Sequence, residues 1–171
     1  MFYQIIKGGK ESIGIAWQYS GSKPQVERIL LPCAKVELLA KIKKEFPKLI
    51  EKEQEMPDKI ASQIAELYLG QKMTVDLSLL NMKRLSEFSA KVLKTTCKIP
   101  RGKVATYSGI AAKIGSPSAA RAVGTALANN PFPIVIPCHR VVRSDGSLGG
   151  FGGGINMKRQ LLAKEGVTFD Y

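Results

Sequence analysis

The chain has 171 residues, of which 44% are hydrophobic and 23% charged, a composition typical of a folded protein with room for one large or two small domains. It carries 26 Lys and Arg against 14 Asp and Glu, a formal net charge of +12. No apolar run reaches the ~20 residues of a membrane helix, and the N-terminus shows no secretory signal. We therefore expect a cytoplasmic protein that does not bind membranes.

The positive charge is concentrated in the second half of the chain. Residues 1–83 carry 13 basic and 10 acidic side chains, whereas residues 84–171 carry 13 basic and 4 acidic ones. A basic half favours a polyanionic partner, most often nucleic acid, although an excess of solvated lysines gives the same balance. The composition changes near Leu80, which predicts two domains, residues 1–82 and residues 83–171.

The first half reads as a small αβ domain with a structural role. Three strand patterns, at residues 2–6, 13–19 and 26–31, are separated by Gly and Ser turns and predict an antiparallel meander. Helical spacing of apolar residues follows at 35–46 and 60–69. Apolar and polar side chains alternate over residues 73–80, which predicts one more strand. This half contains no pattern that indicates chemistry, and Trp17 is expected in its core.

The second half opens with three helix signals. Residues 85–96 predict an amphipathic helix. Residues 110–114 follow a Thr106 or Ser108 cap and end at Gly115, and Ser116-Pro117 then predicts the start of a helix over 118–129. Helix, glycine turn and helix form the helix-turn-helix pattern, which other helical hairpins share.

The helix predicted over residues 118–129 offers one long polar side chain, Arg121, among Ala, Gly and Ser. A protein that reads DNA sequence presents several such side chains to the base edges. We therefore expect DNA binding with little sequence preference.

The pair Cys138-His139 follows the apolar run 134–136, which predicts a buried strand that ends in a turn. His139 is the only histidine, and Cys138 is one of three cysteines. A thiolate is a strong nucleophile, and a nearby imidazole lowers a thiol pKa below its free value of ~8.5. The side chains of adjacent residues usually point apart, so a proton would pass from Cys138 to His139 more easily through one bridging water than through a direct hydrogen bond. The alternative is a structural cysteine beside a core histidine.

Residues 144–147 predict a hairpin turn, and residues 149–154 contain five glycines in six positions. Such a loop allows a ligand to approach the backbone or lets amides converge on an oxygen. It lacks the Lys-Ser/Thr ending of a phosphate-binding loop, which excludes a nucleoside triphosphatase. Residues 155–165 predict a final helix. One His and three scattered Cys indicate a reducing compartment and no metal site, and we expect no cofactor.

Six motifs occur together in the second half of the chain: Thr106-Tyr107, Arg-Ala-Val-Gly at 121–124, Asn130-Pro131, Pro-Cys-His-Arg-Val-Val at 137–142, the glycine-rich loop and Leu-Leu-Ala-Lys-Glu-Gly at 161–166. In these motifs the chain resembles the O6-alkylguanine-DNA alkyltransferases, also called methylated-DNA–protein-cysteine methyltransferases. The resemblance implies an α/β (α+β) fold, with a small N-terminal αβ domain around an antiparallel sheet and a mostly helical C-terminal domain with a helix-turn-helix.

The resemblance also implies roles for individual residues. Cys138 would accept the alkyl group, His139 would act as a water-mediated base, and Glu165 would orient the imidazole. Asn130 would organise the active-site turn, and Tyr107 would crowd the target phosphate and donate its hydroxyl to the departing guanine. Arg121 would replace the flipped nucleotide in the stack. The expected DNA contacts are Thr106, Tyr107, Ser108, Ser116, Ala120 and Arg121, and the expected pocket residues are Pro133, Val141, Phe151 and Gly152.

The implied activity is direct-reversal DNA repair by a single-turnover methylated-DNA–protein-cysteine S-methyltransferase. Its substrates would be O6-alkylguanine, and O4-alkylthymine, in double-stranded DNA bound through the minor groove by a monomer that joins the nucleoid when bound. The product would be a thioether at Cys138, which offers water no electrophilic carbonyl and is not regenerated. Two alternatives are a helix-turn-helix protein that binds alkylated DNA without chemistry and a cysteine hydrolase.

Overall fold

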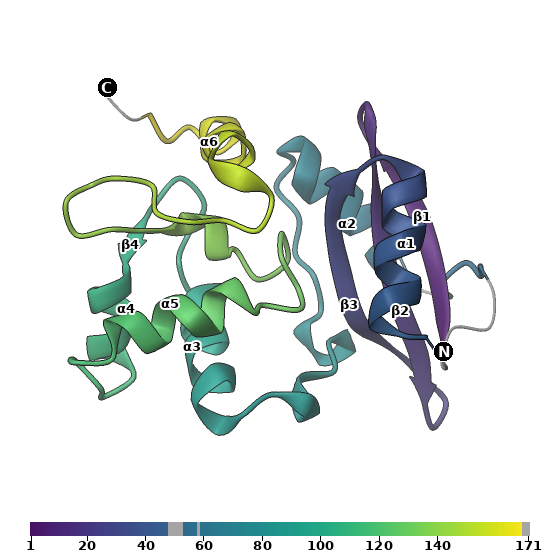
Figure 1. Ribbon diagram of the computed structural model, residues 1–171, viewed down its shortest axis with the longest axis horizontal. Helices are drawn as coiled ribbons and strands as arrows, with labels where there is room; N and C mark the ends of the chain where they lie inside the picture. Colours follow the sequence, from purple (N-terminus) through teal and green to yellow (C-terminus); the bar gives the residue numbers. More distant parts are fainter. Residues whose placement is uncertain (48–52, 58, 169–171) are drawn as a thin grey trace. The chain divides into compact units, whose positions relative to one another are not determined.

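The computed structural model describes residues 1–47, 53–57 and 59–168. The chain divides into two compact units, an N-terminal unit, Met1–Asn81, and a C-terminal unit, Met82–Tyr171 (Figure 1). The architecture agrees with the expected α+β class: an antiparallel sheet with helices in the first unit and mostly helices in the second. None of the helices in the described ranges is long and apolar enough to cross a membrane.

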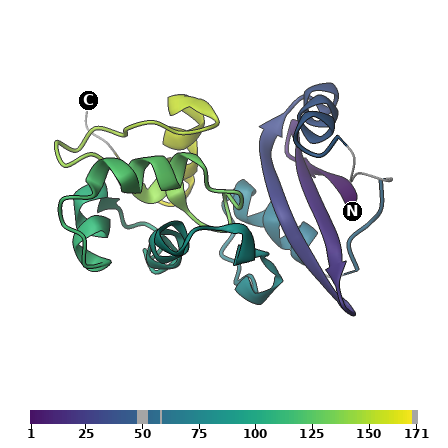
Figure 2. The same ribbon diagram turned by 60° about the horizontal axis from the view of Figure 1, so that its bottom comes forward.

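The N-terminal unit is built on a three-stranded antiparallel sheet with strands in chain order (Figures 1 and 2). Its strands are β1 (Phe2–Gly8), β2 (Glu11–Ser20) and β3 (Lys23–Cys33). Gly9 and Gly21 stand in the two hairpin turns with φ of 72° and 63°, values that favour glycine. The predicted meander is confirmed, and each strand extends beyond its apolar pattern because polar residues at the ends continue the ladder.

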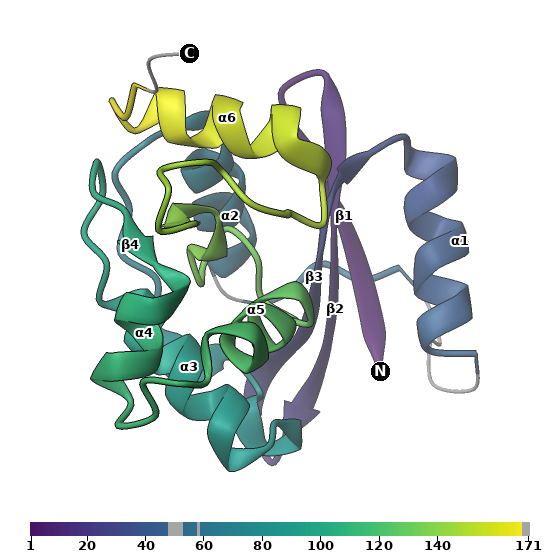
Figure 3. The ribbon, with the colours of Figure 1, turned by 60° about the vertical axis from the view of Figure 1, so that its left-hand side comes forward.

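Helix α1 (Lys35–Glu45) covers one face of this sheet and α2 (Ile60–Leu69) covers the other (Figure 3). Consecutive side chains of a strand point to opposite faces, yet Ile15 and Ala16 of β2 are both fully buried. Both helices were predicted, and Gly70, with φ of 95°, ends α2. The sheet is therefore the middle layer of the unit.

The strand predicted over residues 73–80 is wrong. The segment forms a short 3-10 helix, Leu77–Leu79, and only Leu80 makes an isolated bridge, to Val26. The Asp76 carboxylate accepts hydrogen bonds from the backbone N–H and the hydroxyl of Ser78, at 2.9 and 2.8 Å. This local turn competes with the backbone pairing of a strand.

The C-terminal unit begins with a 3-10 turn, Met82–Arg84, and three helices that pack on one another. These are α3 (Glu87–Cys97), α4 (Tyr107–Lys113) and α5 (Ala120–Ala128), close to the predicted positions (Figure 3). Their shared apolar core includes Val92, Leu93, Ile110, Val123 and Leu127. Helix–turn–helix is therefore the observed arrangement of α4 and α5.

The turn between α4 and α5 differs from the prediction in one respect. Thr106 caps α4 by accepting a hydrogen bond from the Gly109 N–H, and Gly115, with φ of 78°, follows the end of the helix, as expected. The expectation that Ser116 caps the second helix is wrong, because α5 begins at Ala120. Residues 116–119 form a separate turn, closed by a hydrogen bond from the Ala119 N–H to the Ser116 carbonyl.

The buried strand predicted over residues 134–136 is also wrong. These residues form a turn, in which Ile134 has φ of 75°. Pro131 and Pro133 lack the N–H that a ladder requires, and Asn130 provides side-chain hydrogen bonds in place of strand pairing. Cys138 consequently opens a short 3-10 helix, Cys138–Arg140, rather than ending a strand.

A strand follows this helix instead. β5 (Val141–Val142) pairs in parallel with β4 (Ala105–Thr106). The turn predicted at residues 144–147 is present, with a hydrogen bond from the Arg143 N–H to the Ser147 carbonyl. It does not form a hairpin, because in the described part of the chain β5 pairs with β4 and not with the residues after Leu148.

The last helix, α6 (Gly154–Lys164), follows the glycine-rich loop and ends before Gly166, as predicted. It contributes Leu162 to a small core with Val142 and Leu148. Helix α6 also contacts the 3-10 helix that carries Cys138. Glu165, the residue after α6, is thereby brought to the reactive segment.

Candidate active site

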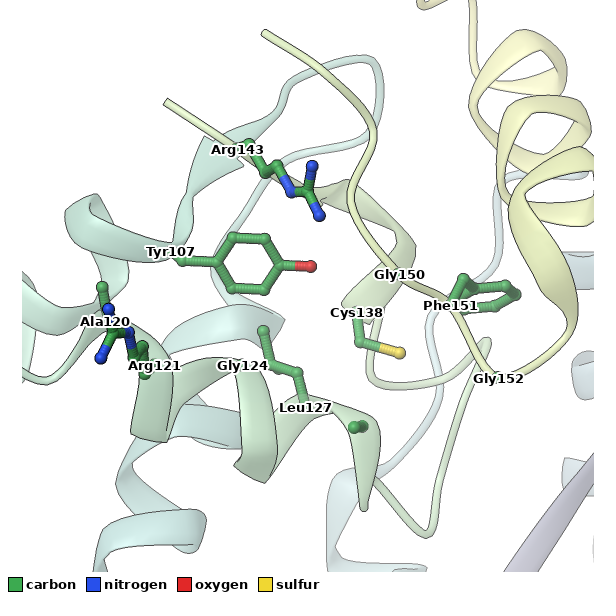
Figure 4. A pocket seen from close by; sticks show the side chains of 11 residues that line it. Tyr107, Ala120, Arg121, Gly124, Leu127, Cys138, Arg143, Gly150, Phe151 and Gly152 are labelled. Carbon is green, nitrogen blue, oxygen red and sulfur yellow. The ribbon is translucent and has the colours of Figure 1, made fainter. Parts of the chain in front are cut away.

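Cys138 lines a pocket of about 580 Å³ in the C-terminal unit (Figure 4). Its wall comes from four places: Tyr107 at the start of α4, one face of α5, Arg143 after β5, and the glycine-rich loop at residues 150–152. Most of the lining is apolar or glycine, and the polar groups are few, as in ligand pockets generally. The residues of α5 that line it are Ala120, Arg121, Gly124, Leu127 and Ala128.

Asn130 holds the turn that leads to Cys138. Its Nδ2 donates to the Ile136 carbonyl at 3.1 Å and to Cys138 Sγ at 3.3 Å, while its Oδ1 accepts from the Phe132 N–H at 2.9 Å. Three bonds from one buried amide fix both ends of the turn. They also hold Ile134 in its left-handed conformation, which a β-branched residue rarely adopts and which the surroundings must enforce.

Behind the cysteine lies an ion-paired cluster of His139, Arg140 and Glu165. His139 Nε2 lies 3.1 Å from Glu165 Oε1. Arg140 donates two hydrogen bonds to the same carboxylate, from Nε and from Nη2, each at 2.8 Å. Arg140 Nη1 also donates to the Ile99 carbonyl at 2.7 Å. Burial by itself would raise the pKa of Glu165, but the hydrogen bonds from His139 and Arg140 lower this pKa to about 2.

The state of the imidazole follows from this carboxylate. Burial lowers the pKa of His139, against the opposing effect of Glu165, so the ring is neutral at neutral pH. An ionised carboxylate only accepts hydrogen bonds. Nε2 therefore carries the proton, and Nδ1 carries a lone pair. Nδ1 is buried and has no hydrogen-bond partner within the described ranges, which leaves it available to take a proton.

The expectation of a lowered thiol pKa is wrong for the resting protein. Cys138 is 8% exposed, and its burial raises the pKa of the thiol. The hydrogen bond from Asn130 and the positive charge of Lys158 act in the opposite direction but are smaller. The resting group is therefore a thiol, and a base must remove its proton during reaction.

Lys158 of α6 is a site residue that the sequence analysis missed. It is fully buried, and its Nζ donates to the carbonyls of Val141 at 2.6 Å, Leu148 at 2.5 Å and Gly150 at 3.4 Å. These three acceptors match the three protons of an ammonium group. Burial lowers the pKa of Lys158 to about 8. The ammonium group thus ties the glycine-rich loop to β5.

Tyr107 is fixed between two glycines. A Cβ at Gly149, which has φ of 68°, would lie 2.9 Å from the Tyr107 hydroxyl, and one at Gly124 would lie 3.9 Å from the ring. Burial raises the pKa of Tyr107, and Cys138 raises it further, so the phenol keeps its proton. The loop and α5 can therefore approach the ring closely, and the hydroxyl remains a hydrogen-bond donor.

The remaining predicted site residues fall into two groups. Phe151, Gly152, Ala120 and Arg121 line the pocket, and Arg121 is exposed on α5. Thr106 and Ser108 lie at the start of α4, with their hydroxyls 3.1 Å apart, and Ser116 lies in the turn before α5. Pro133 and Val141 are buried and are not among the residues that line the pocket, which differs from the expectation that they wall it.

Within residues 1–47, 53–57 and 59–168, no three His, Cys, Asp or Glu side chains are grouped so as to hold a metal ion. Cys97 lies away from the pocket lining, and burial raises its pKa to about 11, which indicates an unreactive thiol. Of the three cysteines, Cys138 is the one that combines a pocket with a neighbouring base.

Residues 87–167 match the family described as 6-O-methylguanine DNA methyltransferase, DNA binding domain. Among curated proteins, the methylated-DNA–protein-cysteine methyltransferase of Methanothermobacter thermautotrophicus is 46% identical over 101 residues, 59% of this chain and 56% of that protein. The protein of the same name from Mycobacterium tuberculosis is 50% identical over 82 residues, 48% of this chain and 50% of that protein. The matches thus span about half the length of these curated relatives.

Solved structures match over more of the chain. The crystal structure of Mycobacterium tuberculosis OGT in complex with DNA superposes with a TM-score of 0.77 at 30% identity, covering 96% of this chain and 92% of that one. The O6-methylguanine-DNA methyltransferase from the hyperthermophilic archaeon Pyrococcus kodakaraensis gives a TM-score of 0.71 at 27% identity, covering 96% and 99%. The similarity therefore extends over both units.

Proposed function

Because the chain belongs to the methylated-DNA–protein-cysteine methyltransferase family, we propose that it repairs alkylated DNA by transferring the alkyl group to Cys138. The observation that carries this proposal is the placement of the Cys138 thiol in a pocket large enough for a purine, with a neutral imidazole as its neighbour. Asn130 aims the sulfur by a hydrogen bond, and Glu165 fixes the imidazole.

In the proposed reaction, the sulfur attacks the carbon attached to O6 of alkylguanine. The S–C bond forms as the C–O6 bond breaks, and the electron pair of the broken bond goes to the guanine. The thiol proton passes to Nδ1 of His139 through one bridging water, and Glu165 stabilises the imidazolium that results. The Lys158 ammonium favours the thiolate that develops at Cys138.

The leaving guanine requires stabilisation, since charge develops on its ring as the bond breaks. Tyr107 keeps its proton and lines the pocket, so it can donate its hydroxyl to a ring nitrogen of the guanine. The Phe151-Gly152 segment forms another part of the pocket wall and can offer a backbone N–H to O6. Lys158 supports this wall through the Gly150 carbonyl.

The proposed DNA contact is made by the helix-turn-helix. Helix α5 presents Ala120, Gly124 and Ala128 beside Arg121, a small-residue surface that permits close approach without reading base edges. We assign to this surface binding through the minor groove with little sequence preference, with Thr106, Ser108 and Ser116 contacting the backbone. Arg121 would fill the space left in the stack when the nucleotide is flipped out.

Further features of the proposal follow from the chemistry of the product. A thioether at Cys138 has no carbonyl for water to attack, so each molecule acts once. The same site would accept O4-alkylthymine, in which an alkyl group is likewise bound to an exocyclic oxygen. A monomer is sufficient, because one chain supplies every group that the reaction uses.

Stoichiometry tests the proposal. A fixed amount of protein is titrated with duplex DNA that carries O6-methylguanine, and the methyl groups on protein are counted by mass spectrometry. We expect a plateau at one methyl group per chain, located on Cys138, and none for C138S, which should still bind DNA. Continued turnover would indicate a hydrolase, and binding without an adduct would indicate a non-catalytic lesion binder.

A further inference from the structure

Arg143 is a charged residue of the pocket that the proposed chemistry does not use. It follows β5 and lines the pocket, and its side chain is exposed. Its backbone is fixed in a turn: the Arg143 N–H donates to the Ser147 carbonyl at 2.9 Å, and its carbonyl accepts from the Gly146 N–H at 3.1 Å. Asp145 stabilises this turn by accepting from the Ser147 N–H and hydroxyl. The backbone from which the Arg143 guanidinium extends is therefore held in a fixed turn.

The charges around Arg143 indicate what it can bind. In the described part of the chain the lining of the pocket includes two arginines, Arg121 and Arg143, and no Asp or Glu. Arg143 lowers the pKa of Tyr107 and of Lys158, which places its charge within electrostatic range of the pocket interior. It also lowers the pKa of Asp145, an exposed carboxylate. No hydrogen bond or ion pair of its guanidinium with a described residue is present, so the group is available to an anion.

The direction in which a nucleotide enters shows where that anion would lie. The alkyl carbon must reach Cys138 Sγ, which is buried, so the base enters first and the sugar and phosphates stay at the mouth. Arg143 and the Tyr107 hydroxyl lie on the same side of the pocket (Figure 4), and Arg121 belongs to the part of its lining that comes from α5. A guanidinium presents paired donors that match two phosphate oxygens.

Resting on the proposed function, we propose that Arg143 binds a backbone phosphate of the flipped nucleotide and so holds the base in the pocket. Arg121 and Arg143 then divide the work of extrusion. Arg121 occupies the space vacated in the duplex, whereas Arg143 retains the nucleotide that has left it. The contribution of Arg143 should therefore depend on the presence of a phosphate and not on base pairing.

Small substrates test this assignment directly. Transfer rates are measured for free O6-benzylguanine, O6-benzyl-2′-deoxyguanosine and its 3′- and 5′-monophosphates, for the wild type, R143A, R143K and K94A. Lys94 is an exposed lysine of α3 outside the pocket lining, so K94A removes the same charge as a matched control. We expect R143A to slow a monophosphate roughly tenfold, with R143K intermediate, and to leave the free base and the nucleoside unchanged.

Duplex and single-stranded DNA extend the test. R143A should slow transfer on both by a similar factor and reduce the salt dependence of binding by about one phosphate contact. A methylphosphonate at the contacted phosphate should slow the wild type and not R143A. Equal losses on the free base and the monophosphates, or no loss on either, would overturn the assignment. Failure of the wild type to accept an alkyl group from alkylated duplex DNA would instead count against the proposed function.

Discussion

The two units differ in what their interiors contain. In the N-terminal unit the buried side chains are apolar apart from Glu27, within the described ranges. In the C-terminal unit Thr96, Asn130, His139 and Lys158 are buried as well. Thr96 bonds within its own helix, but the other three surround Cys138. Burial of polar groups costs free energy unless each is paired.

This difference separates two kinds of core. Helices α1 and α2 bury both faces of an antiparallel sheet by apolar contact, which requires size and pattern but few specific partners. In the C-terminal unit the buried donors of Asn130, His139 and Lys158 instead meet specific acceptors, which for Lys158 are three carbonyls. Substitutions should therefore act on stability alone in the first unit and on stability and reactivity together in the second.

The largest expected effect is that of K158M. Methionine keeps much of the buried length but donates no hydrogen bond, so the carbonyls of Val141 and Leu148 lose their partner. We expect a loss of about 3 kcal/mol or more in stability and a loss of transfer to free O6-benzylguanine of at least ~100-fold. Thermal unfolding and single-turnover kinetics measure the two.

The matched control lies in the other core. I15V removes one methyl group from a fully buried residue of β2 and should cost about 1 kcal/mol with unchanged transfer. If K158M left transfer intact, or if I15V reduced it as strongly, the distinction between the two cores would not hold.

Acid should destabilise the chain through Glu165. The pKa of this carboxyl is lowered from its ordinary 4.5 to about 2 in the fold, so the stabilisation is complete above pH ~4.5 and is lost as the pH falls toward 2. At ~1.4 kcal/mol per unit, the effect is about 3 kcal/mol. Urea unfolding between pH 2 and 7 measures it. E165Q should remove this part of the pH dependence, and an unchanged slope in E165Q would contradict the assignment.

His139 and Glu165 should act as a unit in the transfer step. We expect H139A and E165A each to slow transfer by ~100-fold, because each removes the oriented base, and the double variant to be no slower than the slower single one. Single-turnover rates of the wild type, the two single variants and the double variant give the double-mutant cycle that measures this coupling. A double variant whose loss is the product of the two would show independent roles.

The smallest expected effect concerns Arg121, since it depends on the substrate. R121A should slow repair of duplex DNA by about tenfold or more, single-stranded DNA less, and free O6-benzylguanine least, because extrusion costs a few kcal/mol only in the duplex. R121K keeps the positive charge and loses the planar guanidinium. Compared with R121A, it should therefore restore the salt dependence of DNA binding but not the rate of repair of duplex DNA. Similar losses on all three substrates would exclude the stacking role.

Several features were predictable from local patterns. Strand patterns, apolar spacing and capping signals predicted β1 to β3 and the helices α1 to α6 to within a few residues. The Cys138-His139 pair stood out in the sequence, whereas Glu165 came only from the family resemblance. The strands expected at residues 73–80 and 134–136 do not form, because the side chains of Asp76 and Asn130 accept hydrogen bonds from nearby backbone N–H groups. That competition depends on side-chain geometry, which apolar spacing does not record.

The site also has parts that no local pattern indicates. Lys158 reads as one more polar residue on a helix, and its burial depends on carbonyls 8 to 17 residues earlier in the chain. The thiol pKa is raised because the fold buries Cys138, whereas the sequence shows only the adjacent imidazole. Arg143 likewise becomes a pocket residue only once β5 pairs with β4 and directs the following turn.

The contacts of Arg140 have a consequence for local opening of the native state. Its guanidinium joins the segment after α3, at Ile99, to the residue after α6, Glu165, while its backbone belongs to the 3-10 helix of Cys138. A helix end usually frays at little free-energy cost, but separation of Glu165 from Arg140 would also break contacts of the other two segments. The amide hydrogens of Arg140 and Glu165 should therefore exchange with solvent at the rate of the α3 core. The end of α6 and the reactive segment would open as one cooperative unit.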